Sequence, residues 1–127
     1  MSEYIDKIRF DAQAAEDFFA EKLAFTLGPV ELQHMLAENK VKLIDVRRKE
    51  DYDEGHIPKA LSIPKEELTE KLTQLLKTDV HVVYCYNQQC HLGATAALNL
   101  AKHGYPVMEL DGGFDTWAED FKFEVTK

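Results

Sequence analysis

Two cysteines lie five positions apart in the segment Cys-Tyr-Asn-Gln-Gln-Cys, residues 85–90. Cys85 directly follows Val-His-Val-Val-Tyr, the most strand-like stretch of the chain, and a helix-forming segment begins after Cys90. A tight loop between a buried strand and a helix N-terminus can turn its backbone N–H groups toward one point and bind an anion there. The same donors and the helix dipole favour a thiolate, or a persulfide formed on it. We therefore expect Cys85 to be a nucleophile cradled by the backbone of residues 86–90.

Cys90 has two interpretations that the sequence leaves open. It is either a small apolar side chain at the start of the helix, or a thiol that attacks a Cys85 persulfide and leaves a disulfide. A disulfide requires the two Cα atoms to come within about 7 Å. His91 adjoins Cys90, but structural zinc sites usually present two ligand pairs and no second pair exists here, so we expect no metal site. His91 can instead adjust the charge of the loop.

Asp45 and Arg47 follow a second predicted strand, and Arg47 is a candidate for contact with a substrate at the mouth of the site. The alternative, which we favour, is that the acid and the base hold neighbouring loops through hydrogen bonds. Cys85 is the catalytic candidate. The candidate substrate-binding residues are Arg47, Tyr86, Asn87, Gln88, Gln89, Cys90 and His91.

Hydrophobic periodicity and turn residues predict an alternation of strands and helices. The predicted strands are 24–27, 41–46, 60–63, 79–84 and 107–110, and the predicted helices are 4–23, 29–38, 50–54, 64–77, 91–103 and 114–121. This order implies an α/β fold with a mainly parallel central sheet and helices on both faces. Gly104 suits a helix C-cap, and Trp117 is expected to face the core. Ligands of such sheets bind beyond the C-terminal strand ends, where Cys85 lies.

Composition excludes several classes of partner. The chain has 127 residues, the size of one domain, and a formal net charge of -8. Nucleic acid and anionic membrane surfaces are therefore not expected to bind it. It contains no apolar run near the roughly 20 residues of a membrane span, and its N-terminus lacks the pattern of a signal peptide. We expect a cytoplasmic location and two cysteines that are thiols rather than a disulfide framework.

Three segments resemble the signatures of rhodanese domains. They are Ile44-Asp45-Val46-Arg47 with residues 51–60, Val83-Tyr84-Cys85, and Asp111-Gly112-Gly113-Phe114 with Trp117. The resemblance covers about residues 24–120 and is specific in combination. It implies a single rhodanese-like domain and a sulfurtransferase in which Cys85 accepts sulfur from a small-molecule or protein donor and passes it to a nucleophile. Such covalent chemistry requires no metal or cofactor.

The loop departs from the family pattern at two positions. The fourth residue of a typical rhodanese loop is often Gly and the sixth is often Arg, whereas this chain has Gln88 and Cys90. Binding of thiosulfate or sulfite loses a charge-assisted contact of about 1.5–3 kcal/mol, so we expect a persulfide donor. Related phosphatases and arsenate reductases use a longer loop that ends in Arg, which argues against phosphoryl transfer.

These observations divide the chain into an N-terminal amphipathic helix (1–23), a rhodanese-like domain (24–120) and a C-terminal tail (121–127). The apolar area of the N-terminal helix could cover the domain or form a homodimer. The first functional hypothesis is a sulfurtransferase or persulfide carrier that uses Cys85. The alternatives are a catalytically inactive binding or regulatory module and a thiol–disulfide switch formed by Cys85 and Cys90.

Overall fold

The computed structural model describes residues 5–6 and 11–127. Part of the predicted helix at 4–23 therefore lies outside the described residues. The elements in chain order are α2 (Ala12–Phe25), β1 (Thr26–Leu27), α3 (Pro29–Ala37), β2 (Lys42–Asp45), α4 (Lys49–Glu54), β3 (Leu61–Ser62), 3-10 turns at Lys65–Glu67 and Leu72–Gln74, β4 (His81–Tyr84), α5 (Leu92–Lys102), β5 (Val107–Leu110), α6 (Gly113–Asp115) and a π-helical turn (Thr116–Asp120).

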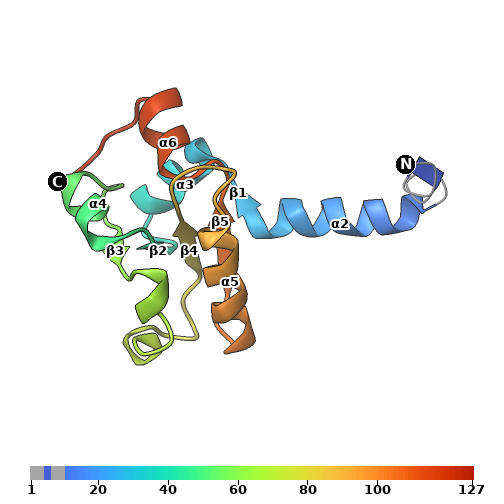
Figure 1. Ribbon diagram of the computed structural model, residues 1–127, viewed down its shortest axis with the longest axis horizontal. Coiled ribbons are helices and arrows are strands. Elements are labelled where there is room, and N and C mark those ends of the chain that lie inside the picture. Colours follow the sequence, from blue (N-terminus) through green and yellow to red (C-terminus); the bar gives the residue numbers. More distant parts are fainter. Residues whose placement is uncertain (1–4, 7–10) are drawn as a thin grey trace.

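The five strands form one parallel sheet in the order β1-β5-β4-β2-β3. Strand β4 is the central strand, where Val83 lies between Ile44 of β2 and Glu109 of β5. Neighbouring parallel strands need crossover connections, which here pass through helices and turns on the faces of the sheet (Figure 1). The predicted α/β fold with a parallel sheet is confirmed.

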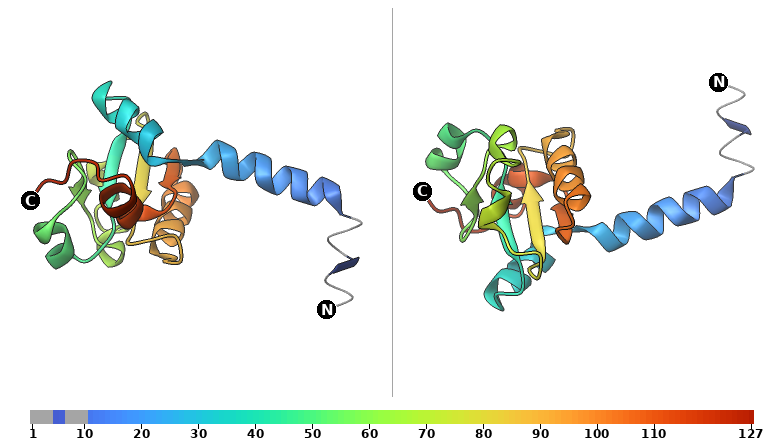
Figure 2. Two further views of the ribbon diagram at one scale, coloured as in Figure 1. Left: turned by 90° about the horizontal axis from the view of Figure 1, so that it is seen from above. Right: turned by 90° about the horizontal axis from the view of Figure 1, so that it is seen from below.

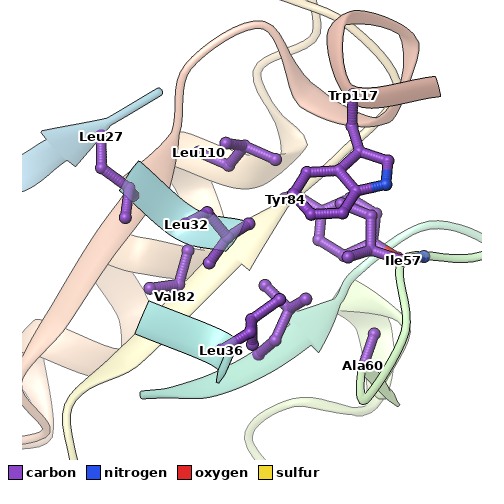
Figure 3. Packing of buried hydrophobic residues seen from close by; sticks show 10 residues of the cluster. Leu27, Leu32, Leu36, Ile57, Ala60, Val82, Tyr84, Leu110 and Trp117 are labelled. Atoms are coloured by element: carbon purple, nitrogen blue, oxygen red, sulfur yellow. The ribbon is translucent and has the colours of Figure 1, made fainter. Parts of the chain in front are cut away.

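Alternation along β4 sends its side chains to two separate cores. Val82 and Tyr84 pack with residues of α3 and with Trp117, and Figure 3 shows this cluster around Tyr84. Val83 and Cys85 pack on the opposite face with Ala96 and Leu100 of α5. Figure 2 shows this helix in orange against the sheet. Each large apolar side chain that is fully buried contributes about 1.5–3 kcal/mol, so the strand that carries Cys85 is fixed from both sides.

The predicted helix at 64–77 is wrong. Only two short 3-10 turns form there, because tertiary contacts take the polar groups of the segment. The carbonyl of Leu72 accepts a hydrogen bond of 2.9 Å from the Tyr105 hydroxyl, and Asn99 donates to the Thr69 hydroxyl at 3.0 Å. The leucine pattern still anchors the segment, since Leu68 is completely buried.

Helix α2 extends away from the sheet (Figures 1 and 2), and none of its residues is buried. It therefore does not cover the domain. Its exposed apolar side chains are Phe18, Phe19, Leu23 and Phe25. An isolated helix of this length is marginal in water; that α2 mediates a homodimer stays a prediction. Within the described part of the chain, no helix combines the length and hydrophobicity that a membrane crossing requires.

The C-terminal tail is attached to the domain rather than loose. His56 and Thr126 exchange two backbone hydrogen bonds of 2.8 Å each, and the indole nitrogen of Trp117 donates to the Glu124 carbonyl at 2.8 Å. Trp117 is 2% exposed, as its predicted inward orientation requires. The tail thus packs against the core cluster that contains Trp117.

Candidate functional site

Cys85 lies at the carboxyl end of the central strand and is 3% exposed. A disulfide joins it to Cys90, with the two Cα atoms 6.6 Å apart. That separation falls within the range that a disulfide spans. The two thiols that the sequence places five positions apart therefore meet at one point above the sheet.

Asn87 folds the loop back on itself. Its side-chain oxygen accepts hydrogen bonds from the amides of Gln89 and Cys90 at 3.1 and 3.0 Å, and its carbonyl also accepts from the Cys90 amide at 3.2 Å. Asn side chains commonly close turns in this way. The turn returns the chain toward Cys85 just before α5 begins.

The expectation that the loop amides converge on the sulfur needs correction. The N–H groups of Gln89 and Cys90 point to Asn87 and not to Cys85. An amide that donates within the turn has no remaining proton for an anion. The side chains of Gln88 and Gln89 are exposed. In this disulfide form, two of the expected cradle donors are therefore committed to the shape of the loop.

A glycine turn supports the loop from below. The amide of Phe114 donates to the Cys85 carbonyl at 2.9 Å, and the amide of Asp115 donates to the Tyr86 carbonyl at 2.9 Å. Gly113 has φ +65°, and a Cβ there would lie 2.8 Å from the Cys85 carbonyl oxygen. Only glycine combines this left-handed conformation with so close an approach. The Gly-Gly turn of the C-terminal signature thus positions the strand end that carries the thiol.

The N-terminus of α5 lies directly beside the thiol. His91 is the exposed N-cap residue of this helix and contributes no side-chain capping hydrogen bond. A Cβ on Gly93 would lie 3.6 Å from the Cys85 Cβ, so the first turn of the helix packs against this residue. The positive end of the helix dipole therefore acts at the sulfur pair and favours its thiolate form when the disulfide is reduced.

Glu109 is a residue of the site that the sequence analysis missed. A Cβ on Gly93 would lie 2.6 Å from a Glu109 carboxylate oxygen. The Glu109 side chain therefore reaches the first turn of α5 from β5. Burial raises the pKa of Glu109, the charge of Asp111 raises it further, and His91 lowers it. An acidic residue inside an otherwise apolar strand was the available signal. The site therefore has an acidic side, opposite in sign to what an anionic donor needs.

A buried polar cluster lies at the ends of β2 and β4. Asp45 and Tyr84 are opposite in the strand register, and the Tyr84 hydroxyl donates to the Asp45 carboxylate at 2.6 Å. Arg47 donates to the same carboxylate through Nε and Nη2, the latter at 2.8 Å. Burial, followed by the charge and hydrogen bond of Asp45, raises the pKa of Tyr84. The tyrosine is therefore a neutral donor.

Arg47 is committed to this cluster rather than free for substrate. It is 3% exposed, and Nη2 also donates to the Gly55 carbonyl at 2.6 Å. Burial alone would lower the pKa of Arg47, but the hydrogen bond and charge of Asp45 outweigh it and raise the pKa. Its guanidinium still lines a surface hollow of about 450 Å³ beside Tyr86. These contacts agree with the interpretation favoured from the sequence, in which Asp45 and Arg47 hold neighbouring loops through hydrogen bonds.

Tyr86 links the loop to α4. Its hydroxyl donates to the Asp51 carboxylate and accepts from the Arg48 amide at 3.4 Å. Burial, and then the hydrogen bond to Asp51, raise the pKa of Tyr86. Among residues 5–6 and 11–127, no three His, Cys, Asp or Glu side chains gather as a metal-binding group.

These features define an α/β protein whose thiol lies at the end of a central parallel strand, next to a helix N-terminus. The Rhodanese-like domain family matches residues 28–120. The chain belongs to the rhodanese-like family.

Two curated proteins of different names match part of this chain. The chain is 36% identical over 87 residues to "HTH-type transcriptional regulator Rv0324" of Mycobacterium tuberculosis (strain ATCC 25618 / H37Rv), covering 68% of this chain and 38% of that one. It is 29% identical over 90 residues to a "Probable molybdopterin-synthase adenylyltransferase" of Porphyra purpurea, covering 69% and 24%. The chain thus spans less than two fifths of the length of these curated relatives.

A solved structure shares nearly the whole arrangement. The BH2092 protein of Bacillus halodurans superposes with a TM-score of 0.81 at 29% identity, covering 91% of this chain and 86% of that one. Residues 26–127 make up only about four fifths of the chain, so the match extends into the N-terminal part that contains α2.

Proposed function

We propose that this chain is a sulfurtransferase or sulfur carrier that holds a transferable sulfur atom as a persulfide on Cys85. The observation that carries the proposal is the position of this cysteine, at the end of β4 and against the first turn of α5. A persulfide there is stabilised by the helix dipole without a metal or cofactor. Membership of the rhodanese-like family supports the same chemistry.

The charges around the site favour a persulfide donor over thiosulfate. Arg47 is the candidate clamp for an oxyanion that the sequence indicated, and its donors are directed to Asp45 and Gly55. The carboxyl groups of Glu109 and Asp111 lie close enough for their charges to interact. A dianion such as thiosulfate meets this negative field, whereas the reacting persulfide group of a small-molecule or protein donor carries at most one negative charge. The acceptor would be a thiol or another thiophilic nucleophile.

The test compares two donors with one acceptor. Reduced protein is mixed with cyanide and either thiosulfate or a glutathione persulfide donor, and thiocyanate formation is followed. We expect turnover with the persulfide donor, weak turnover with thiosulfate, and loss of both in Cys85→Ser. Equal turnover by Cys85→Ser would contradict the proposal.

The inactive binding module remains the second candidate, and the loop geometry favours it in one respect. The amides of Gln89 and Cys90 point into the turn, and Cys85 is almost fully buried. The first feature removes hydrogen-bond donors from a sulfur anion, and the second restricts access to the sulfur. Turnover with neither donor, by protein whose disulfide has been reduced, would favour this candidate.

A further inference from the structure

We propose that Cys90 is a second catalytic residue, a resolving thiol that releases the sulfur carried by Cys85 as hydrosulfide and closes the Cys85–Cys90 disulfide. This inference rests on the proposed function, because it requires a persulfide on Cys85. A second thiol allows the carried sulfur to be released as sulfide, which a carrier with one cysteine cannot do by itself. The chain would then deliver free sulfide and also pass sulfur intact to an acceptor.

The geometry brings the second thiol to the atom that must be attacked. Cys90 Sγ bonds directly to Cys85 Sγ in the structure, with the Cα atoms 6.6 Å apart. Cys85 Sγ is the inner sulfur of the persulfide. Asn87 holds the Cys90 amide through both its side-chain oxygen and its carbonyl, so the turn that produces this approach is built into the loop.

The chemistry balances without an external oxidant. The Cys90 thiolate attacks Cys85 Sγ, and a new sulfur–sulfur bond forms between the two cysteines. The bond from Cys85 Sγ to the outer sulfur breaks, and the outer sulfur leaves with the electron pair and its own proton as hydrosulfide. The outer sulfur is reduced to hydrosulfide, and the two cysteines are oxidised to a disulfide. The persulfide itself is therefore the oxidant.

Attack on the outer sulfur would give a different result. It would move the sulfur atom to Cys90 and return Cys85 as a thiolate, with no disulfide and no release. Of these two attacks on the persulfide, the one on the inner sulfur produces the bond that the structure contains. The helix dipole of α5 acts at both positions and favours the attacking thiolate.

The product must then be reduced by a dithiol. Cys85 is 3% exposed whereas Cys90 is partly exposed, so an incoming thiol reaches Cys90 Sγ first. Attack there expels Cys85 as a thiolate beside the helix N-terminus, ready for the next sulfur. The reaction class that must follow is thiol–disulfide exchange with a small dithiol or a dithiol protein.

The test is a single-turnover experiment on the full chain. Reduced protein, free of reductant, receives one equivalent of glutathione persulfide, and released sulfide and intact mass are measured. We expect wild-type protein to release about one equivalent of sulfide and to end about 2 Da below the dithiol mass, as disulfide formation requires. Cys90→Ser should instead retain one sulfur atom, about 32 Da, and release little sulfide.

Two controls keep the result specific. Ala94→Ser adds a hydroxyl on the exposed side of α5 and should behave as wild type, and Cys90→Ala should behave as Cys90→Ser if loss of the thiol is the cause. Stable retention of the sulfur by wild type and Cys90→Ser alike would overturn this inference and leave the Cys85 persulfide intact. Absence of added sulfur and of sulfide in both would overturn the proposed function together with the inference.

Discussion

Two regions at the same edge of the sheet are built in opposite ways. The cluster of Asp45, Arg47 and Tyr84 is almost completely excluded from water, and its side chains are joined to one another and to the backbone of Gly55 and Ile57 by hydrogen bonds. The loop of residues 86–91 is mostly exposed and depends on one side chain, Asn87, for its turn. Cys85 lies at the junction, with its backbone in the first region and its sulfur in the second.

Positioning and reactivity are therefore separated in this fold. A buried ion pair with satisfied hydrogen bonds is costly to break, so it fixes where the strands end. An exposed turn can rearrange when its disulfide is reduced, because little of the core depends on it. Changes in the cluster should therefore alter stability, and changes in the loop should alter chemistry.

The largest effect is expected from Asp45→Asn. The substitution leaves the buried Arg47 guanidinium without its counter-charge, and breaking such a pair costs about 3–5 kcal/mol. Urea unfolding measures the change. Asp53→Asn, which removes the charge from an exposed pair with Lys49, is the matched control and should change stability little. Equal losses of stability in Asp45→Asn and Asp53→Asn would contradict a special role for the buried Asp45–Arg47 pair.

Tyr84→Phe should have the next largest effect. The hydroxyl donates to Asp45 and accepts from the Ile57 amide at 3.1 Å, so its loss leaves a buried donor unsatisfied at a cost of about 1–3 kcal/mol. The apolar ring remains and keeps the core filled. Urea unfolding of reduced protein provides the measurement, and an unchanged midpoint would show that the hydroxyl contributes nothing to the cluster.

Glu109→Gln should give a smaller, pH-dependent gain. Burial, followed by Asp111, raises the pKa of Glu109, so folding favours the protonated form more than the unfolded chain does. The stability associated with that form is present at low pH and is lost as pH rises through the folded pKa, above the ordinary value of about 4.3. The variant should exceed wild type in stability at neutral pH and match it in acid. A stability difference between variant and wild type that widens on acidification would show that folding does not raise the pKa of Glu109.

Asn87→Ala should have the smallest effect on stability, about 1 kcal/mol or less. The loss of the turn should nevertheless slow closure of the Cys85–Cys90 disulfide. Thiol counting after addition of oxidised glutathione follows the rate. Unaltered closure would show that Asn87 does not position Cys90.

The elements of the buried region were predictable from sequence, because local patterns specify them. Val-His-Val-Val-Tyr gave the central strand, and the positive φ of Gly104, +87°, agrees with the expected C-cap of α5. The joint position of Asp45 and Tyr84 could not be read in the same way. It depends on the register between β2 and β4, which joins residues far apart in the chain.

The site was predictable only in outline. The sequence indicated that Cys85 and Cys90 could meet, but not whether the Cα atoms come within reach. The direction of the Gln89 amide was not predictable either, because the competition of Asn87 for it depends on the loop conformation. The position of Glu109 at the site was not predicted, because its carboxylate approaches Gly93 only after β5 and α5 have packed together.

The location of the added sulfur in Cys90→Ser shows whether Cys85 carries it. After treatment with a persulfide donor, the protein is capped with an alkylating agent, digested, and mapped by tandem mass spectrometry. We predict the extra sulfur on the peptide that contains Cys85 and its absence from the same peptide of Cys85→Ser, which carries a hydroxyl there. An unmodified Cys85, in protein that remains folded and reduced, would contradict the claim that this strand end holds a transferable sulfur.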